Sequence, residues 1–323
     1  MLRYAGKRII QMLPILIGVS LIIFLIFSFA PGDIVDTMGA TTHLSVQKAA
    51  QLRHINHLDE PKLVQYVYWL TNAVKGNLGY SLEYRQPVTQ VLGSYIWNSF
   101  YLALACFIAT ILIALPLGII SATKQYSAFD SIFTVVALIG ISLPTFFMGM
   151  LLIKWLAIDV SLFPVSGMVT SGSNYTGFSK VLDVLYHMFL PFVVLTFANV
   201  ASLMRYVRTS MLEVSRQDYI RTARAKGLKE KVVIYKHALR NGLIPVITIL
   251  GMWLPGLFSG AIITEQIFGW PGIGRITLQA VNDRDYPLLM GFNMLIALLT
   301  LLGNLLADIT YAAVDPRIRL DDK

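Results

Sequence analysis

Residues Ser99 to Ser121 read SFYLALACFIATILIALPLGIIS, a stretch of 23 residues without one charged side chain. About 20 apolar residues in a helix are long enough to cross the hydrocarbon core of a bilayer. Lipid offers no hydrogen bonds to a bare backbone, so such a segment must satisfy its own peptide groups, as a helix does. This stretch therefore predicts a membrane-spanning helix.

Five further stretches share this pattern, and the composition agrees with it. They run from Ile9 to Ala30, Phe133 to Ala157, Val184 to Met204, Leu243 to Thr264 and Leu288 to Ala312. The whole chain is 56% hydrophobic and 14% charged, against about 25% charged residues in a soluble domain. The predicted fold class is all-α, a polytopic membrane protein with six transmembrane helices.

The first of these stretches also resembles a secretory signal peptide. Arg3, Lys7 and Arg8 precede the apolar run, and residues 28–30 read Ser-Phe-Ala, which could serve as a cleavage site. The apolar core of a signal peptide is about 7–15 residues long, and this run is longer. We therefore expect an uncleaved membrane anchor.

The distribution of Lys and Arg predicts the orientation of the chain, because cytoplasmic loops carry an excess of both. Of the 26 Lys and Arg residues, 17 lie in the N-terminus, at Lys124, in residues 205–241 and in the C-terminal tail. Both termini are therefore predicted to be cytoplasmic in a bacterial plasma membrane. This placement assigns the net charge of +8 to membrane lipid and not to nucleic acid.

The predicted spans divide the chain into four segments. These are a cytoplasmic N-terminus with the first span (1–30), an extracytoplasmic loop (31–97), a five-helix core (98–312) and a cytoplasmic tail (313–323). In the outer loop we expect one helix from Ser45 and another from Pro61 that ends at Gly76. The second should place Leu63, Val67, Leu70 and Val74 on one face and pack at the mouth of a pore. A solvent-facing cap without a role in transport is the alternative.

The basic segment 205–241 is predicted to be a docking element for another protein. It carries ten Lys or Arg residues, yet it is interrupted by Ala223, Ala225 and Gly227-Leu228. We expect two short helices with a turn at Gly227, where the absence of a Cβ permits a positive φ or a close approach. A loop that binds lipid headgroups is the alternative.

Catalytic and cofactor motifs are not found in this sequence. It contains no G-x-x-x-x-G-K-[ST] phosphate loop, and the glycine-rich residues 269–274 lack the required Lys. The single cysteine, Cys106, and five scattered histidines form no recognised metal spacing, so no metal or cofactor is predicted. Asp308 lies near the end of the last span and is more easily explained by an ion pair than by proton-driven transport.

The segment 218–228, DYIRTARAKGL, followed by HALRN at 237–241, resembles the cytoplasmic signature loop of binding-protein-dependent ABC permeases. The similarity is greatest to the B-type subunit of the dipeptide, oligopeptide and nickel group. Further matching motifs are GNLGYS (76–81), LPTF (143–146), FPVSG (163–167), IFGWPGIGR (267–275) and DPRIR (315–319). One departure is that Arg221-Thr222-Ala223 stands where the broader family signature begins Glu-Ala-Ala.

This resemblance implies a type I ABC importer permease fold and a non-catalytic transport subunit. It implies four kinds of partner: a second homologous permease subunit in a heterodimer, two cytoplasmic ABC ATPase subunits, an extracytoplasmic substrate-binding protein and membrane lipid. Peptide is the expected substrate, with nickel or another small solute, or a secondary transporter, as alternatives. The residues expected to couple the chain to an ATPase are Asp218, Arg221, Thr222, Ala223, Arg224, Ala225, Lys226, Gly227, Leu228, Arg240 and Asn241.

The missing phosphate loop generates a biochemical prediction. The purified chain, separated from any ATPase, is expected neither to bind nor to hydrolyse ATP, because nothing in it can cradle the phosphates. Equilibrium binding of a fluorescent ATP analogue measures this. Saturable binding to the isolated chain would contradict the expected division of labour.

Overall fold

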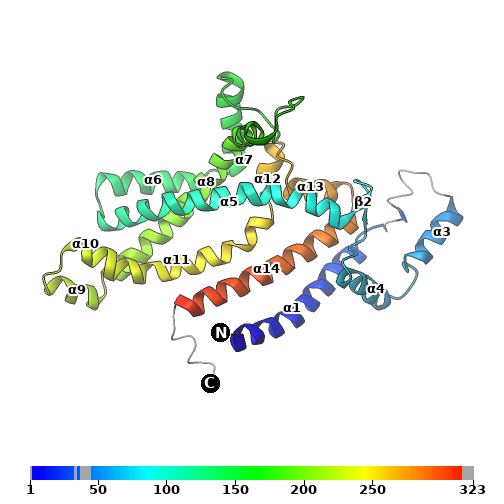
Figure 1. Cartoon of the computed structure of the whole chain (residues 1–323), viewed down its shortest axis with the longest axis horizontal. Helices are drawn as coiled ribbons and strands as arrows, with labels where there is room; N and C mark the ends of the chain where they lie inside the picture. Colours follow the sequence, from blue (N-terminus) through cyan, green and yellow to red (C-terminus); the bar gives the residue numbers. More distant parts are fainter. Residues whose placement is uncertain (1, 33–34, 37–44, 315–323) are drawn as a thin grey trace. The chain divides into compact units, whose positions relative to one another are not determined.

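The computed structural model describes residues 2–32, 35–36 and 45–314, with the side chains of residues 6–32, 35–36 and 45–306. The described chain is dominated by helices (Figure 1). The side chain of Asp308 and most of the expected cytoplasmic tail, from residue 315 onward, lie outside these limits. The helices and strands that position the functional segments are α1 (Leu2–Ser28), α3 (Val46–Ile55), α4 (Lys62–Val74), β1 (Tyr80–Ser81), β2 (Gln86–Pro87), α5 (Val88–Thr123), α6 (Ala128–Ser142), α7 (Thr145–Leu152), the π-helix η1 (Ile153–Asp159), α8 (Gly177–Ser215), α9 (Asp218–Ala225), α10 (Glu230–Val232), the π-helix η2 (Val233–Ala238), α11 (Leu239–Trp253), the 3-10 helix η3 (Pro255–Phe258), α12 (Ile262–Ile267), α13 (Ile273–Asn282) and α14 (Tyr286–Val314).

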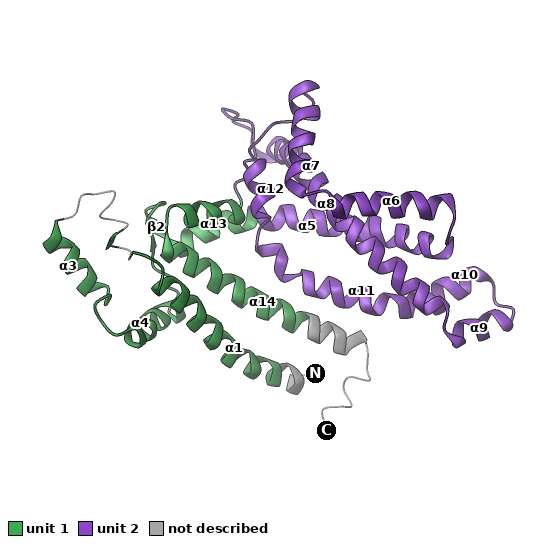
Figure 2. Ribbon diagram, turned by 180° about the vertical axis from the view of Figure 1, so that it is seen from behind, with its two compact units in different colours: residues 1–97, 272–323 green, residues 98–271 purple. Residues whose placement is uncertain are grey.

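The chain forms two compact units, one of residues 1–97 with 272–323 and one of residues 98–271 (Figure 2). In the first unit α1 and α14 pack side by side. Its core gathers buried residues from the start of α5, from α13 and from α14 around Val88, Ile273 and Leu288. In the second unit α8 is the central helix, packed by α6, α7 and α11.

Among the described residues, five helical segments are long and apolar enough to cross a membrane, and a bent pair makes a sixth if it counts as one span. The five are residues Gly6–Ser28, Val88–Thr123, Gly177–Ser215, Glu230–Phe258 and Tyr286–Leu306. The all-α, multi-span fold predicted from the sequence is confirmed. Several helices extend well beyond the predicted span ends, because polar residues continue them into the loops.

The third predicted span, Phe133 to Ala157, is not one straight helix. The segments Ala128–Ser142 and Thr145–Asp159 meet at an angle of 100°. The break lies at Leu143, which is extended, and Pro144, which precedes α7. Proline disfavours the helical conformation of the residue before it, and this explains the break at Leu143. Counting apolar residues alone could not reveal the bend.

The fifth predicted span, Leu243 to Thr264, is also interrupted. Its helix continues through the 3-10 turn at Pro255 and ends at Phe258, and Gly260 follows with φ +74°. Residues that carry a side chain rarely adopt this φ, so the glycine lets the backbone turn sharply into α12. The last residues of the predicted span therefore form a separate short helix.

The two outer-loop helices lie where the sequence predicted them, and α4 leaves its aliphatic face exposed within this chain. Ser45 caps α3 by accepting from the backbone of Lys48, as expected. In α4 the aliphatic face is largely exposed, with 73% exposure at Leu63, 60% at Val67 and 81% at Val74. The helix instead buries Gln65 and Tyr66. Within this chain the aliphatic face is therefore not buried, and its packing at the mouth of a pore stays a prediction.

The helices of the second unit approach closely where one of them carries a glycine. A Cβ built on Gly118 of α5 would lie 2.7 Å from the Val207 side chain of α8. A Cβ on Gly140 of α6 would lie 2.9 Å from that of Ala201 on the same α8. Small residues at such contacts are typical of membrane helices, whose association depends on close van der Waals packing.

A buried ion pair joins the ends of α5, α6 and α8. Arg208 donates to both carboxylate oxygens of Asp130, from Nε at 2.7 Å and from Nη2 at 2.9 Å. The same carboxylate accepts from the hydroxyl of Ser121 and from the backbone N–H of Tyr126 at 3.0 Å. The Asp130 side chain is 5% exposed and the Arg208 side chain is 24% exposed. Sequence reasoning missed this pair, since the two residues are 78 positions apart.

The Asp130–Arg208 pair generates a stability prediction. Asp130→Ala is expected to cost about 3 kcal/mol or more in the free energy of unfolding, because it leaves a largely buried guanidinium without its counter-ion. Thermal unfolding of the purified protein in detergent measures this. The matched control is Asp159→Ala, which removes the exposed partner of Lys154 and is expected to cost under about 1 kcal/mol. Equal effects of the two substitutions would show that the buried pair contributes no special stability.

Candidate functional site

The basic segment 205–241 is built from the ends of two long helices and a short helix between them. Residues 205–215 are the last three turns of α8, and α9 follows after a two-residue break. After the turn at residues 226–229, α10, η2 and α11 continue as one helical run. Figure 1 shows α9 and α10 together at the end of this run. The short helix and the turn at Gly227 predicted from the sequence are confirmed, whereas the second predicted short helix is the start of the long run into α11.

Gly227 ends α9 in a left-handed conformation, with φ +73°. Its N–H donates to the carbonyl of Arg224 at 2.9 Å, and the N–H of Leu228 donates to the carbonyl of Ala223 at 3.4 Å. These two bonds form a Schellman cap, in which glycine is favoured because it adopts a positive φ without strain. A Cβ built on Gly227 would meet nothing within 4 Å. The glycine is therefore needed for its backbone conformation and not for a close contact within the chain.

Ala223 and Ala225 have different surroundings although they are two residues apart on α9. Ala223 is 6% exposed and packs in a cluster with Ile220, Val233 and Ala238. Ala225 is exposed. The expectation that both small side chains make room for another protein does not fit Ala223, which packs against the chain's own core. Ala225 alone of the two faces outward.

Side-chain bonds hold α9 against the helix that follows it. Arg224 donates to both carboxylate oxygens of Glu230, at 3.2 and 2.7 Å, across the turn at Gly227. This hydrogen bond raises the pKa of Arg224 above its ordinary value, so the guanidinium stays charged. Asn241 of α11 donates to the hydroxyl of Tyr219 at 3.1 Å. Hydrogen bonds within the chain therefore already fix the turn and both of its flanking helices in the absence of a partner.

The remaining predicted site residues lie on the exposed surface of the segment. This group is Asp218, Arg221, Thr222, Lys226, Leu228 and Arg240. The same surface exposes four large apolar or aromatic side chains. Their exposed fractions are 43% at Tyr219, 40% at Leu228, 37% at Val232 and 58% at Tyr235. A surface that mixes exposed apolar side chains with positive charge is suited to contact with another protein.

The two long helices of the site are packed tightly where they meet this segment. The hydroxyl of Ser210 on α8 donates to the carbonyl of Gly242 on α11 at 2.7 Å. A Cβ built on Gly242 would lie 2.8 Å from the sulfur of Met211. Direct contacts therefore join α8 to α11 next to this segment.

Sequence reasoning missed a buried carboxylate, Glu265 of α12. Its side chain is fully buried, and Oε1 accepts from the hydroxyl of Ser99 at 2.6 Å and from the N–H of Ala261 at 3.1 Å. A Glu near the end of an apolar run was the available signal. The bonds tie α12 to α5, so the carboxylate holds the chain after the break at Gly260.

A cavity of about 330 Å³ lies beside this break in the second unit. Its walls are mostly apolar and come from α5, α8 and the end of α11. The lining residues are Ala103, Cys106, Phe107, Leu195, Asn199, Met252, Trp253, Gly256, Leu257, Gly260 and Ala261. In the part of the chain that the structure describes, no three His, Cys, Asp or Glu residues gather as metal ligands.

Comparison with known proteins identifies relatives of nearly equal length. Residues 114–320 match the family described as binding-protein-dependent transport system inner membrane component, and residues 1–98 match its N-terminal counterpart. The oligopeptide transport system permease protein AppB of Bacillus subtilis (strain 168) is 40% identical over 98% of this chain and 99% of its own. A putative peptide permease protein of Brucella suis biovar 1 (strain 1330) is 38% identical over 99% and 100%. The dipeptide transport system permease protein DppB of Escherichia coli (strain K12) is 38% identical over 99% of both chains.

The contrast between Ala223 and Ala225 generates a prediction about folding. Ala223→Glu is expected to destabilise the chain by at least about 2 kcal/mol, because it forces a charge into the cluster around Ile220. Ala225→Glu is expected to stay within about 0.5 kcal/mol of the unsubstituted chain, because its side chain faces outward. Membrane abundance and thermal unfolding in detergent measure both effects. Loss of abundance in both variants would show that α9 is packed differently.

Proposed function

The chain belongs to the binding-protein-dependent transport system inner membrane component family, and from that membership we propose that it is the permease subunit of an ATP-driven peptide importer. In this role it forms half of a translocation pathway and receives peptides from an external binding protein. Peptide is favoured because the relatives named above carry oligopeptide, dipeptide or peptide in their names and match almost end to end. Nickel or another small solute is the alternative within the same family.

The energy for transport would come from partner subunits. The chain contains no phosphate loop, so we assign ATP binding and hydrolysis to two ABC ATPase subunits on the cytoplasmic side. A second, homologous permease would supply the other half of the pathway. The excess of Lys and Arg in residues 205–241 and near both termini supports a cytoplasmic position for these parts.

The α9 helix is the element that we assign to ATPase docking. The single observation that carries this is the exposed surface of Ala225 and Leu228 beside a braced turn. Partner binding can use a preorganised surface without ordering it first, which lowers the entropic cost of association. A loop that only attracts lipid headgroups needs positive charge, but it needs neither a capped turn nor exposed apolar side chains.

Movement of α9 would be transmitted to the membrane through α8 and α11. Both helices leave the docking segment directly, and they are joined by the bond between Ser210 and Gly242 and by the contact of Met211 with Gly242. When two ATPases close on ATP, a docked α9 would shift, and the ends of both helices would move with it. The cavity beside Gly260, lined by the same helices, is a candidate part of the pathway.

The docking assignment is tested with the outward-facing alanine. Ala225→Glu is expected to lower both co-purification of the ATPase and peptide uptake by about tenfold or more, because a carboxylate without a partner would be buried in the interface. Ala225→Ser is the matched control, since it keeps the side chain small and uncharged. Membrane abundance, ATPase recovery and uptake of a radiolabelled peptide are measured together.

One result would decide against the assignment, and a second would decide against charge burial as its physical cause. Normal ATPase recovery and normal uptake in Ala225→Glu would show that this face meets no partner. Equal loss in Ala225→Glu and Ala225→Ser would show that the position tolerates no change and that charge burial is not the cause.

A further inference from the structure

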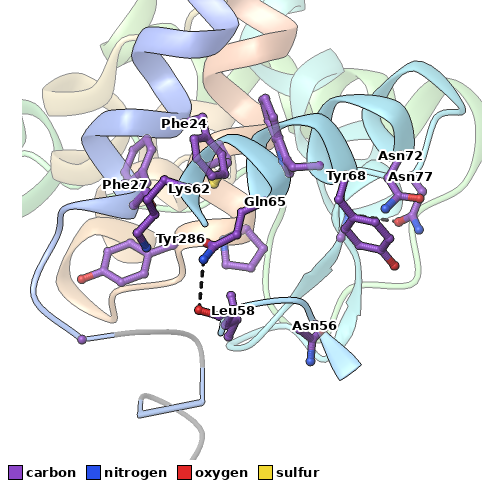
Figure 3. A pocket seen from close by; sticks show the side chains of 16 residues that line it. Phe24, Phe27, Asn56, Leu58, Lys62, Gln65, Tyr68, Asn72, Asn77 and Tyr286 are labelled. Carbon is purple, nitrogen blue, oxygen red and sulfur yellow. Dashed lines mark hydrogen bonds between the residues drawn. The ribbon is translucent and has the colours of Figure 1, made fainter. Parts of the chain in front are cut away.

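A pocket of about 310 Å³ lies in the first unit, between the end of α1, helix α4 and the start of α14 (Figure 3). Phe24 and Phe27 of α1 lie at one end of it, and Asn56 and Leu58 lie at the opposite end. It shares no lining residue with the docking segment or with the cavity beside Gly260. Nothing in the proposed transport cycle accounts for it.

Helix α4 lies alongside the membrane-crossing part of α1. The hydroxyl of Tyr66 lies 2.8 Å from that of Ser20 and 3.3 Å from the carbonyl of Ile17. With a rise of 1.5 Å per residue, Ser20 is about 12 Å below the end of α1 at Ser28. The Phe24 ring also lies 5.6 Å from the Tyr66 ring. Because Gly6–Ser28 is the candidate span, these contacts place Tyr66 of α4 beside the spanning part of α1 and not beyond its end.

The exposed face of α4 is apolar, as this position beside the span requires. Leu63, Val67 and Val74 are each at least 60% exposed. In water these side chains would cost free energy, whereas in a leaflet the acyl chains cover them. Tyr68, Trp69 and Tyr286 line the pocket beside them. Tyr and Trp are enriched at the depth of the headgroups, so the pocket lies where a lipid's polar and apolar parts meet.

The lining of the pocket combines apolar and polar side chains, and Lys62 lies beside Phe27 (Figure 3). Phe24, Phe27 and Met290 supply apolar surface, while Asn56 and Lys62 supply amide and ammonium groups. None of the 16 described residues that line it is Asp or Glu. An anionic group with an apolar tail matches this polarity. A free peptide matches less well, because no carboxylate is present to bind its N-terminal ammonium.

We propose that this pocket binds one phospholipid of the leaflet that meets the C-terminal end of α1, which is the outer leaflet in the proposed orientation. The phosphate lies near Lys62, and the first part of an acyl chain lies against Phe24 and Phe27. The lipid fills the space between α1, α4 and α14 and so fixes α4 in the leaflet.

Native mass spectrometry of the full chain, purified with its partner subunits in mild detergent, tests the proposal. The probe is dioleoylphosphatidylglycerol. Lys62→Glu is expected to weaken its binding by about tenfold or more, because the substitution reverses the charge beside the phosphate. The matched control is Lys75→Glu, which makes the same charge change at the end of α4 outside the pocket. Lys62→Arg should retain the lipid.

Equal binding by Lys62→Glu and Lys75→Glu would overturn the proposal. Displacement of the lipid by inorganic phosphate at similar concentrations would indicate a soluble-anion site instead. Displacement by dialanine would indicate a peptide site, and it would also overturn the lipid assignment.

A second measurement is independent of Lys62. In vesicles that contain dibrominated phosphatidylglycerol, Trp69 should be quenched by the bound lipid, so Trp69→Phe should remove a distinct part of the total quenching. The same fractional quenching in the unsubstituted chain and in Trp69→Phe would contradict the proposal.

Discussion

The hydrogen-bonding demand of the peptide backbone in lipid is the constraint on which this structure depends. Because the hydrocarbon core offers no partners, the chain crosses it as helices and departs from helical geometry only at particular residues. Two such departures lie within predicted spans, at Pro144 and around Pro255. At the second, Glu265 and Ser99 form a side-chain bond in the protein interior. Irregular backbone is thus placed where side chains of the same chain support it.

Fixed contacts around α9 would allow this short helix outside the spans to move the membrane-crossing helices. The α9 helix is fixed to its surroundings by a glycine cap, by the ion pair of Arg224 with Glu230 and by the bond of Asn241 to Tyr219. Both helices that flank it continue into the membrane. These contacts leave α9 little freedom to move independently of the helices on either side of it. In the proposed importer this is how ATP hydrolysis in one protein would move helices in another.

Features set by local chemistry could be read from the sequence, whereas features set by distant contacts could not. Gly227 was predicted as a turn because few other residues suit a positive φ, and its φ is +73°. The burial of Tyr66 in α4 was not predicted, because aliphatic spacing ignores what a tyrosine hydroxyl can bind. Tyr66 is buried since Ser20 and Ile17 offer it hydrogen-bond partners. The pairing of Asp130 with Arg208 depends on how α6 meets α8, which no local pattern records.

Docking of α9 on an ATPase is most directly tested by photocrosslinking in the assembled complex. A benzoylphenylalanine at Leu228, which is 40% exposed beside the Gly227 turn, is expected to crosslink to the ATPase subunit. The same probe at Gln47 of α3 is the control and should not reach that subunit. Crosslinking of the Leu228 probe to lipid alone, in complexes that still transport peptide, would contradict the assignment of this segment to ATPase coupling.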